Sequence, residues 1–349
     1  MKFDFEDVFI TGANGWLGRQ IVESLINNDP DVLILKKNKN ININCLLHVH
    51  DSKDFFIKYG DRVNIIYGDL RHEKSIDNFL YKSNNGLLIH AAGIIHPNKI
   101  KDFYEINFHA TSKLIETAIN KKINKIIVIS SNSPIGCNPN NKHLFNEKSE
   151  YNPYMHYGKS KELMEKYLIK KINEHINITI IRPPWFYGEN MPARQKLFYE
   201  MIISGKFPII GSGLNQRSLA NVKNITQGIF LASVKKISKG KIYWIADDES
   251  LNMLEIIKTI KDVFQNEFNI KSRRNLIKLP FFVGQIFEFF DYFLQRLNIY
   301  SKQIHVLSEL NKNISCDISL AKKELNYNPK ISLYKGTHQA YSKYLKNDK

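Results

Sequence analysis

The first half of the sequence alternates short apolar, β-branched runs with longer segments of helical periodicity. The apolar runs occupy residues 8–10, 43–47, 63–67, 87–90, 125–130 and 178–181. The helical segments lie near residues 16–27, 73–81, 104–120 and 157–174. Strands separated by helices pair in parallel through right-handed crossovers, and the helices then cover both faces of the sheet. The sequence therefore predicts an α/β fold with a doubly wound parallel sheet.

A glycine-rich loop follows the first predicted strand directly. Residues 11–18 read TGANGWLG, with Gly12, Gly15 and Gly18 at equal spacing, and a helical pattern begins within the loop. Glycines allow a tight turn and close backbone approach, and the amino end of a helix offers free N–H groups to a diphosphate. Its place between a strand and a helix favours a dinucleotide-binding loop over an ordinary glycine-containing turn.

The regular alternation ends after residue 181. Arg182-Pro183-Pro184 stops the last predicted strand, and Gly and Pro then recur as far as Gly213. We predict a dinucleotide-binding domain in residues 1–181 and a smaller substrate-binding domain in residues 182–349. The second domain is expected over the carboxyl edge of the sheet, with the option of returning strands or helices to the first.

The composition excludes several classes of protein. With 349 residues, 43 % of them apolar, the chain can bury a sizeable core, so disorder is excluded as its main state. Lys and Arg number 50 against 34 Asp and Glu, but the resulting charge of +16 is spread along the sequence. A nucleic-acid-binding protein is therefore not favoured.

The cysteines and the amino-terminal residues indicate a cellular compartment. Cys45, Cys137 and Cys316 are far apart and lack CxxC spacing, so neither a disulfide framework nor a metal site is expected. The first residues include acids where a secretory signal would be basic, and no run approaches the roughly 18 apolar residues of a membrane span. These features predict a soluble protein of the reducing cytoplasm.

The Phe-rich stretch at residues 280–297 is the exception to this pattern. Its apolar residues are interrupted by Gln285, Glu288, Asp291 and Arg296. Apolar faces of helices usually pack into a core, so we favour a helix that packs on its own domain. The alternative is a helix that lies on a membrane surface without crossing it.

The residue that would contact the adenosine ribose follows the second strand of the sheet. If residues 43–47 form that strand, Leu47 or His48 takes the position, with His48 as the chosen candidate, and Asp51 is the nearest acid. An additional apolar run at residues 31–35 precedes this strand. Without a carboxylate to repel a 2′-phosphate, NADP fits at least as well as NAD.

Tyr157 and Lys161 stand at i and i+4 at the start of a predicted helix and share one face. A phenol that exchanges protons at neutral pH needs its pKa lowered from ~10 to about 7. A neighbouring ammonium and the positive oxidised nicotinamide ring both favour the phenolate. A second such pair, Tyr167 and Lys171, lies further along the helix, and we interpret it as structural.

Two serines complete this candidate constellation. Ser131 follows the strand at residues 125–130, and a polar side chain at that strand end faces the ligand crevice. It can hydrogen-bond the reacting oxygen, and the neighbouring Ser133 can help.

In order along the chain, these segments resemble the extended short-chain dehydrogenase/reductase family. Its members include sugar-nucleotide epimerases and dehydratases and 3β-hydroxysteroid dehydrogenase-like enzymes. The matching segments are TGANGWLG (11–18), GDL (68–70), HAAG (90–93), NFHAT (107–111), SSNSPIG (130–136), YGKSK (157–161) and RPPWFYG (182–188). The resemblance implies a Rossmann fold that binds NAD or NADP.

The resemblance also implies roles for single residues. Together with His48, the expected cofactor-binding residues are Gly12, Asn14, Gly15, Trp16, Leu17, Gly18, Asp69, Leu70, Ala91, Ala92, Gly93, Asn107, Tyr157, Lys161 and Pro184. The expected catalytic residues are Ser131, Tyr157 and Lys161.

Two later segments extend the likeness towards the carboxyl terminus. GSGLNQRS (211–218) resembles the family segment in which an arginine meets the substrate's phosphate, so Arg217 and Ser133 are the expected substrate-binding residues. Ser218 and Asn224 stand where this family segment has acids. DISLAKKELNYNP (317–329) resembles the family's closing element.

The expected activity is that of an oxidoreductase or epimerase. A hydride moves at a secondary alcohol or ketone, with Tyr157 as acid/base, and the resemblance implies a nucleotide-linked sugar as substrate. An apolar hydroxy or keto compound, as in hydroxysteroid dehydrogenase-like or dihydroflavonol reductase-like enzymes, is the alternative. Dehydration ranks last because Asn132 and Ser133 stand where some dehydratases carry acids. A non-catalytic NAD(P)-binding scaffold or sensor is a hypothesis of another class, and a homodimer is left open.

Overall fold

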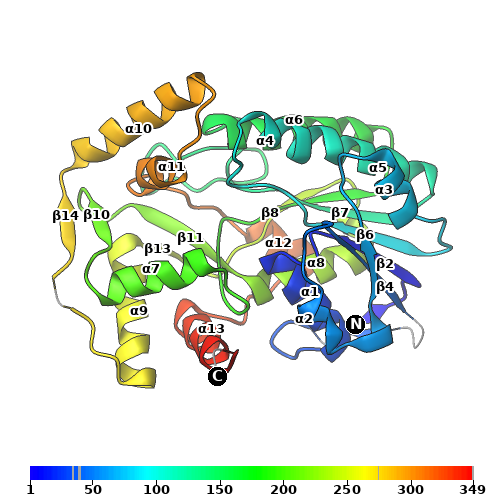
Figure 1. Ribbon diagram of the computed structural model, residues 1–349, viewed down its shortest axis with the longest axis horizontal. Helices are drawn as coiled ribbons and strands as arrows, with labels where there is room; N and C mark the ends of the chain where they lie inside the picture. Colours follow the sequence, from blue (N-terminus) through cyan, green and yellow to red (C-terminus); the bar gives the residue numbers. More distant parts are fainter. Residues whose placement is uncertain (34, 38–40, 274, 348–349) are drawn as a thin grey trace.

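A parallel sheet forms the centre of the computed structural model (Figure 1). The structure describes residues 1–33, 35–37, 41–273 and 275–347. Within these residues, seven strands pair in the order β12-β8-β7-β6-β2-β4-β5, and each pairing is parallel. Their bounds are β2 (Asp7–Thr11), β4 (Asn42–Leu47), β5 (Asn64–Tyr67), β6 (Gly86–His90), β7 (Lys125–Ile129), β8 (Ile178–Arg182) and β12 (Ile242–Trp244). The strand order reverses between β2 and β6, which confirms the predicted doubly wound fold.

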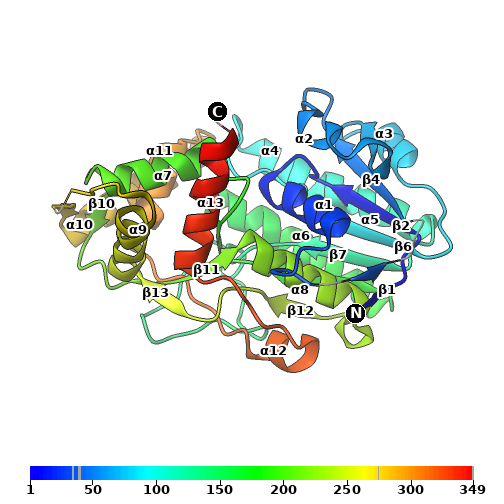
Figure 2. The same cartoon turned by 90° about the horizontal axis from the view of Figure 1, so that it is seen from below.

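Helices cover both faces of this sheet (Figures 1 and 2). One face carries α3 (Glu73–Phe79), α5 (Thr111–Asn120) and α6 (Met155–Asn173), and the other carries α1 (Trp16–Asn27) and α8 (Val222–Val234). Each layer encloses its own apolar core, and successive residues of β2 alternate between the two cores. Because both faces are covered, the strands read as continuous apolar runs.

The second strand of the sheet lies where the sequence predicts it. β4 pairs directly with β2, so residues 43–47 do form that strand. The earlier run at residues 31–35 contains no strand among its described residues: Val32 and Leu35 are buried, and Ile34 lies outside the described residues.

The predicted helix at residues 104–120 consists of three parts. α4 (Lys101–Tyr104) leads into a π-helical turn (Glu105–Ala110), which continues into α5. Such turns insert an extra residue into the helix and often occur at functional sites.

The remaining chain builds smaller layers around a third core. β9 (Trp185–Tyr187), β11 (Gln216–Asn221) and β13 (Ser250–Asn252) form one sheet, and β10 (Pro208–Ile210) pairs with β14 (Ile277–Leu279). α7 (Ala193–Ile203), α9 (Met253–Phe268) and α13 (Leu333–Asn347) contribute to this core. The other short elements are β1 (Lys2–Phe3), β3 (Lys36–Lys37), α2 (Asp54–Ile57), α11 (Lys302–Glu309), α12 (Ser319–Leu325) and the 3₁₀ turns Gly60–Arg62 and Lys236–Ser238. This second half of the chain also returns two elements to the large sheet. β12 pairs with β8, and α8 covers one face of that sheet.

Helix α10 (Phe281–Arg296) packs on its own domain through its polar side. Gly284, Asp291 and Gln295 are buried, whereas Phe289 and Phe293 are 65 % and 50 % exposed. The expectation that the apolar face packs inward is therefore wrong, because the polar stripe finds its partners on α11 and in the segment directly after it. No helix in the described part of the chain has the length and apolarity needed to cross a membrane.

Candidate active site

The glycine loop connects the end of β2 to the first turn of α1. Gly12 has a φ of 67°, and a Cβ there would lie 2.6 Å from the backbone nitrogen of Ala92. A Cβ on Gly18 would overlap the carbonyl oxygen of Gly12. Only glycine fits at these two positions, and the amino end of α1 then faces the crevice with its N–H groups. The loop therefore has the shape that a dinucleotide diphosphate requires.

The loop after β6 lies beside the glycine loop. The N–H of Ala91 donates to the carbonyl oxygen of Thr11 over 3.2 Å, at the point where the strand order reverses. Asn107, in the π-helical turn, accepts from the N–H of Ile94 (2.8 Å) and donates to the carbonyl oxygen of the same residue (3.0 Å). This pair of hydrogen bonds fixes the chain after Gly93. Such switch points form the ligand crevice of open α/β sheets.

Charged side chains gather at the ends of β4 and β5. Nε2 of His48 lies 3.5 Å from Oδ2 of Asp69, and Arg71 pairs with the same carboxylate at 2.5 Å. The hydrogen bond from Arg71 holds the pKa of Asp69 at about 2, so the carboxylate stays charged. On the glycine loop, Arg19 donates to Oδ1 of Asn14 over 2.9 Å. The structure thus brings His48 and Asp69, two predicted cofactor residues, into one corner.

Helix α6 brings Tyr157 against the strand end that carries Ser131. The side chain of Ser131 acts on the Tyr157 hydroxyl and favours its phenolate, and Oγ of Ser133 lies 3.3 Å from Oγ of Ser131. The close approach depends on Gly158, where a Cβ would lie 2.5 Å from the carbonyl oxygen of Ser133. The predicted serines and the predicted tyrosine therefore form one cluster.

Lys161 lies one helical turn beyond Tyr157 and is only 4 % exposed. Its Nζ donates to the carbonyl oxygen of Ile129 over 3.1 Å. A Cβ on Gly93 would lie 3.4 Å from the same Nζ, so the ammonium lies between β7 and the loop after β6. Burial lowers the pKa of Lys161 to about 8.

Burial raises the pKa of Tyr157 to about 12. This direction is opposite to the lowering that the sequence predicts. The hydrogen bond with Ser131 and the charge of Arg194 act to lower the pKa, and the charge of Glu309 acts to raise it. The chain by itself therefore favours the neutral phenol, because burial outweighs the groups that stabilise the phenolate.

Two charged residues near Tyr157 lack any sequence motif. Arg194 lies at the start of α7, with its guanidinium 5.9 Å from the centre of the Trp16 ring, so it connects the glycine loop to Tyr157. Glu309, the last residue of α11, acts electrostatically on both Tyr157 and Arg217. Neither belongs to a recognisable pattern, so only the tertiary arrangement identifies them.

Arg217 is buried on β11, on the side of the crevice formed by the second half of the chain. Its guanidinium donates to the carbonyl oxygen of Glu309 and lies 5.7 Å from the centre of the Trp185 ring. Asn224, which replaces a family acid, donates to Asp247 (2.6 Å) and to the carbonyl oxygen of Ile331 (2.8 Å). Asn224 therefore holds buried structure together and does not face a substrate.

The second tyrosine and lysine pair of α6 lies on its outer side. Tyr167 donates to Oε1 of Glu116 over 2.7 Å, and Lys171 pairs with the same carboxylate at 2.8 Å. These contacts join α6 to α5.

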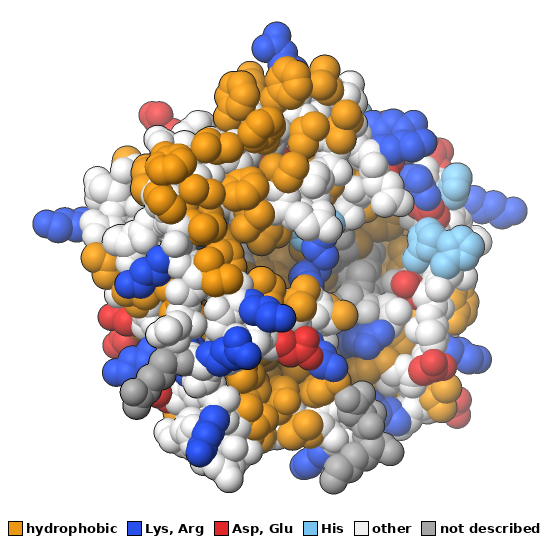
Figure 3. Space-filling model, turned by 60° about the vertical axis from the view of Figure 1, so that its left-hand side comes forward, with side chains coloured by type: hydrophobic (Ala, Val, Ile, Leu, Met, Phe, Trp, Pro, Cys, Tyr) orange, Lys and Arg blue, Asp and Glu red, His pale blue; other side chains and the backbone are white. Residues whose placement is uncertain are grey.

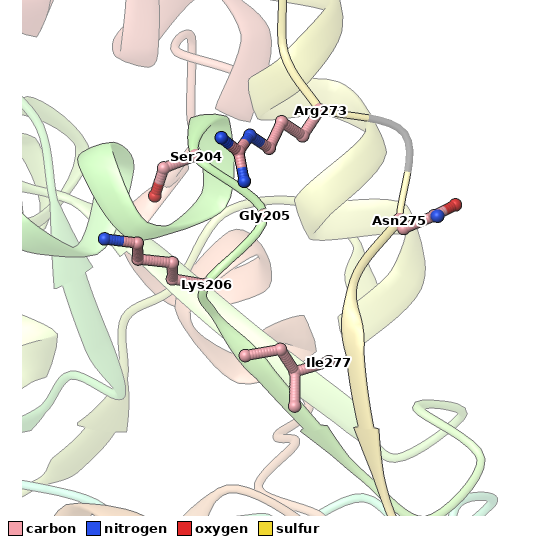
Figure 4. Close-up of a pocket in the computed structure, with 6 residues that line it drawn as sticks. All are labelled: Ser204, Gly205, Lys206, Arg273, Asn275 and Ile277. Atoms are coloured by element: carbon pink, nitrogen blue, oxygen red, sulfur yellow. The ribbon is translucent and has the colours of Figure 1, made fainter.

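A separate pocket of about 430 Å³ lies between α7, β10 and β14 (Figure 4). Its lining consists of Ser204, Gly205, Lys206, Arg273, Asn275 and Ile277. None of these residues belongs to the cluster around Tyr157, so the pocket is not part of the candidate active site.

The sheet, the glycine loop and the cluster around Tyr157 define a nicotinamide-dependent enzyme of the doubly wound class. The model of the NAD dependent epimerase/dehydratase family matches residues 8–246, from β2 to just beyond β12, and the chain belongs to this family. Its cofactor is accordingly NAD or NADP, as the sequence predicts, and the glycine loop fits that group.

Relatives and solved structures agree with this assignment. The chain is 41 % identical to the "Uncharacterized protein y4nL" of Sinorhizobium fredii over 97 % of this chain and 95 % of that protein. It is 26 % identical to the N-acetyl-alpha-D-glucosaminyl-diphospho-ditrans,octacis-undecaprenol 4-epimerase of Escherichia coli, over 80 % of this chain and 77 % of that enzyme. It is 24 % identical to the decarboxylating sterol-4-alpha-carboxylate 3-dehydrogenase of Dictyostelium discoideum, over 95 % and 98 % of the two chains.

Among solved structures, the fold is similar to that of dTDP-glucose 4,6-dehydratase from Bacillus anthracis, which was solved in complex with NAD. The TM-score is 0.74 at 15 % identity, over 98 % of this chain and 97 % of that one. The likeness extends over nearly the whole chain and confirms the Rossmann fold.

Proposed function

We propose that this protein transfers a hydride at a secondary alcohol or ketone carbon of a sugar that is linked through a diphosphate. A nucleotide-linked sugar is the first candidate substrate. The observation that carries the proposal is the cluster of Ser131, Tyr157 and Lys161 at the carboxyl edge of the sheet, beside the glycine loop.

In the proposed oxidation, the substrate hydroxyl lies against Ser131 and Tyr157. The phenolate oxygen of Tyr157 accepts the hydroxyl proton while the adjacent carbon loses a hydride, and Ser131 donates a hydrogen bond to the same oxygen. When bound, NAD or NADP supplies the hydride acceptor and a positive ring. Lys161, held by the carbonyl oxygen of Ile129, binds ribose hydroxyls and favours the phenolate. Simple oxidation leaves a ketone, and epimerisation inverts the configuration at the same carbon.

The substrate-binding side supports a diphosphate-linked substrate. Arg217 is a buried cation whose Nε lacks a partner among the described side chains, and Arg194 adds a second cation near Tyr157. Guanidinium groups suit phosphate oxygens because their planar donors match the oxygen spacing. The Escherichia coli relative, whose name describes a diphospho-linked sugar, is consistent with this substrate class.

One observation favours a second candidate, an apolar hydroxy or keto compound. Helix α10 exposes many apolar side chains and contacts the residue before Tyr157 through Gln295, and the Dictyostelium relative carries a sterol dehydrogenase name. A clear rise in melting temperature with UDP- or TDP-sugars, and none with a sterol, would argue for the first candidate.

The test measures turnover of nucleotide sugars, a polyprenyl-diphosphate sugar and hydroxysteroids, each with NAD and with NADP. Turnover is detected by absorbance of the reduced nicotinamide and by chromatography of the products. Tyr157→Phe is expected to lose on the order of 10²–10⁴ of the rate while still binding cofactor. Tyr167→Phe, on the outer side of the same helix, serves as the matched control and should keep its rate. Equal rates in both variants would eliminate the proposed base, and cofactor binding without any turnover would favour the scaffold or sensor.

Dehydration stays the last-ranked of the candidate reactions. A cytoplasmic location stays a prediction, and a homodimer stays open.

A further inference from the structure

Helix α10 is amphipathic, but it is oriented opposite to an ordinary surface helix. Its fully buried residues are small or polar, and most of its large apolar side chains point outward. The exposed apolar side chains of α10 and the loop after it are Phe281, Phe282, Ile286, Phe289, Phe290, Tyr292, Phe293, Leu297 and Ile299, each between 45 % and 65 % exposed. Figure 3 shows hydrophobic side chains gathered over this side of the molecule, beside a hollow in the surface. We name these nine residues the aromatic face.

The polar stripe of α10 is fully engaged, so the helix cannot simply rotate to bury its aromatic face. Asp291 accepts from His305 (2.7 Å) and from Gln295 (2.8 Å). Glu288 pairs with Lys312 at 2.5 Å, and a Cβ on Gly284 would overlap the side chain of Asn311. The orientation is therefore fixed by hydrogen bonds, and the aromatic face stays at the surface.

The charges around the aromatic face have one sign. Residues 271–302 contain two acids: Asp291 is buried against His305, and the half-buried Glu288 is paired with Lys312. The exposed charged side chains described in the same range are Lys271, Arg273, Lys278, Arg296 and Lys302. In Figure 4, Lys206 and Arg273 lie on the pocket next to β14, the strand that leads into α10. An anionic surface is the complementary partner.

We propose that the aromatic face binds the surface of an anionic phospholipid bilayer, with the basic side chains at the headgroups and the Phe side chains at the acyl boundary. Helices with a large apolar face, Phe and Leu residues and flanking Lys and Arg residues bind membranes in this way without crossing them. An exposed apolar area of this extent is otherwise rare on a monomeric protein.

The bilayer would then lie next to the candidate active site. Gln295 of α10 accepts a hydrogen bond from the N–H of His156 over 3.2 Å, and His156 directly precedes Tyr157. A substrate with a lipid part could therefore stay in the membrane while its polar part reaches the crevice.

Vesicle flotation of the full chain, without substrate, tests the proposal. The wild type should bind vesicles of phosphatidylcholine mixed with phosphatidylglycerol and bind vesicles of phosphatidylcholine alone more weakly. The double variant Phe289→Ser and Phe293→Ser should weaken binding at least about tenfold. Ile57→Ser, at a site on α2 that is 64 % exposed, is the control and should bind as the wild type does.

A second pair of variants measures the electrostatic contribution to vesicle binding separately from the apolar contribution. Lys278→Glu and Arg296→Glu should each weaken binding to the anionic vesicles about fivefold or more, and high salt should weaken the wild type in the same direction. No binding of the wild type, or unchanged binding of the double Phe variant, would overturn the proposal. So would self-association in sedimentation velocity that the double Phe variant abolishes, because the face would then belong to a second copy of the chain. Since no substrate is present, a failure of the proposed function would leave these results unchanged.

Discussion

The side-chain oxygen of Gln295 accepts a hydrogen bond from the backbone N–H of His156 over 3.2 Å. The two residues are far apart in the sequence, and the contact joins α10 to the amino end of α6, immediately before Tyr157. The amide nitrogen of Gln295 donates to Asp291, so the side chain is held at both ends. The position of the candidate base thus depends on a helix from the second half of the chain.

Replacement of this residue tests that dependence. Gln295→Ala should lower the free energy of unfolding by about 1–3 kcal/mol, because it leaves the part-buried N–H of His156 without this acceptor and removes one of the donors to the buried Asp291 carboxylate. It should also reduce kcat several-fold by loosening Tyr157. Denaturant unfolding and steady-state kinetics measure the two effects. Gln285→Ala, at an exposed position of the same helix, should change neither, and an unchanged kcat in Gln295→Ala would show that α6 is fixed without this contact.

The buried ammonium of Lys161 should lower the free energy of unfolding of the protein at neutral pH. Since burial lowers its pKa to about 8, the protonated form costs stability at neutral pH, and this cost falls as pH rises from about 8 towards the ordinary value near 10.5. Lys161→Met should therefore raise the free energy of unfolding at pH 7 by about 1–3 kcal/mol, after allowance for the lost hydrogen bond. Activity should be lost. Unfolding curves between pH 7 and pH 10 should show the two proteins converging, and a variant less stable than wild type at pH 7 would contradict the argument.

A buried ion pair holds α6 against β8. Glu165 and Arg182 are both buried and pair at 2.5 Å. Glu165→Gln should destabilise the fold by about 3–5 kcal/mol, because it leaves the guanidinium buried without a counter-charge. Glu162→Gln is the control on the same helix, since Glu162 pairs with the exposed Lys159 and Lys166 and should cost less than about 1 kcal/mol. Similar midpoints for both variants in urea would refute the role of the buried pair.

Arg19 should influence the choice between NAD and NADP. Its guanidinium lies on the glycine loop, and the charge of Asp51 acts on it from the turn that carries His48. A 2′-phosphate bound at this corner would pair with Arg19, so Arg19→Ala should weaken NADPH binding about tenfold and NADH binding much less. Fluorescence titration of both reduced cofactors measures the difference. Arg62→Ala is a surface control, and an equal loss for the two cofactors would assign Arg19 a purely structural role.

The sequence predicts the first half of the fold well because most strands there, though not the edge strand β5, are buried on both faces. Covered strands read as continuous apolar runs, and residues 43–47 could be placed next to β2 on this basis alone. The π-helical turn at Asn107 could not be predicted, since a shift of the apolar pattern by a single residue is too small a signal to recognise within one helix. Strand ends and i, i+4 spacing follow from local geometry, so the sequence could single out Ser131, Tyr157 and Lys161 as candidates, and their catalytic roles stay predictions.

The orientation of α10 and the residues Arg194 and Glu309 depend on long-range contacts. Periodicity shows that a helix has an apolar side, but it does not show which side meets the domain, and here Asp291 and His305 decide the matter. Arg194 and Glu309 come from segments without a motif and meet Tyr157 only in the folded chain. Burial, which raises the pKa of Tyr157 in the chain alone, cannot be read from the spacing to Lys161, and the lowering expected with the positive nicotinamide ring bound stays a prediction.

Because β12 returns to the large sheet from the second half of the chain, β8 is synthesised long before its outer partner strand. When β8 emerges from the ribosome, its outer edge has no partner, because Ile242–Trp244 are still to be translated. An unpaired apolar edge invites association with other chains. The nascent protein is therefore prone to associate through β8 until residue 244 has been added. A chain cut after residue 181 would keep this unpaired edge.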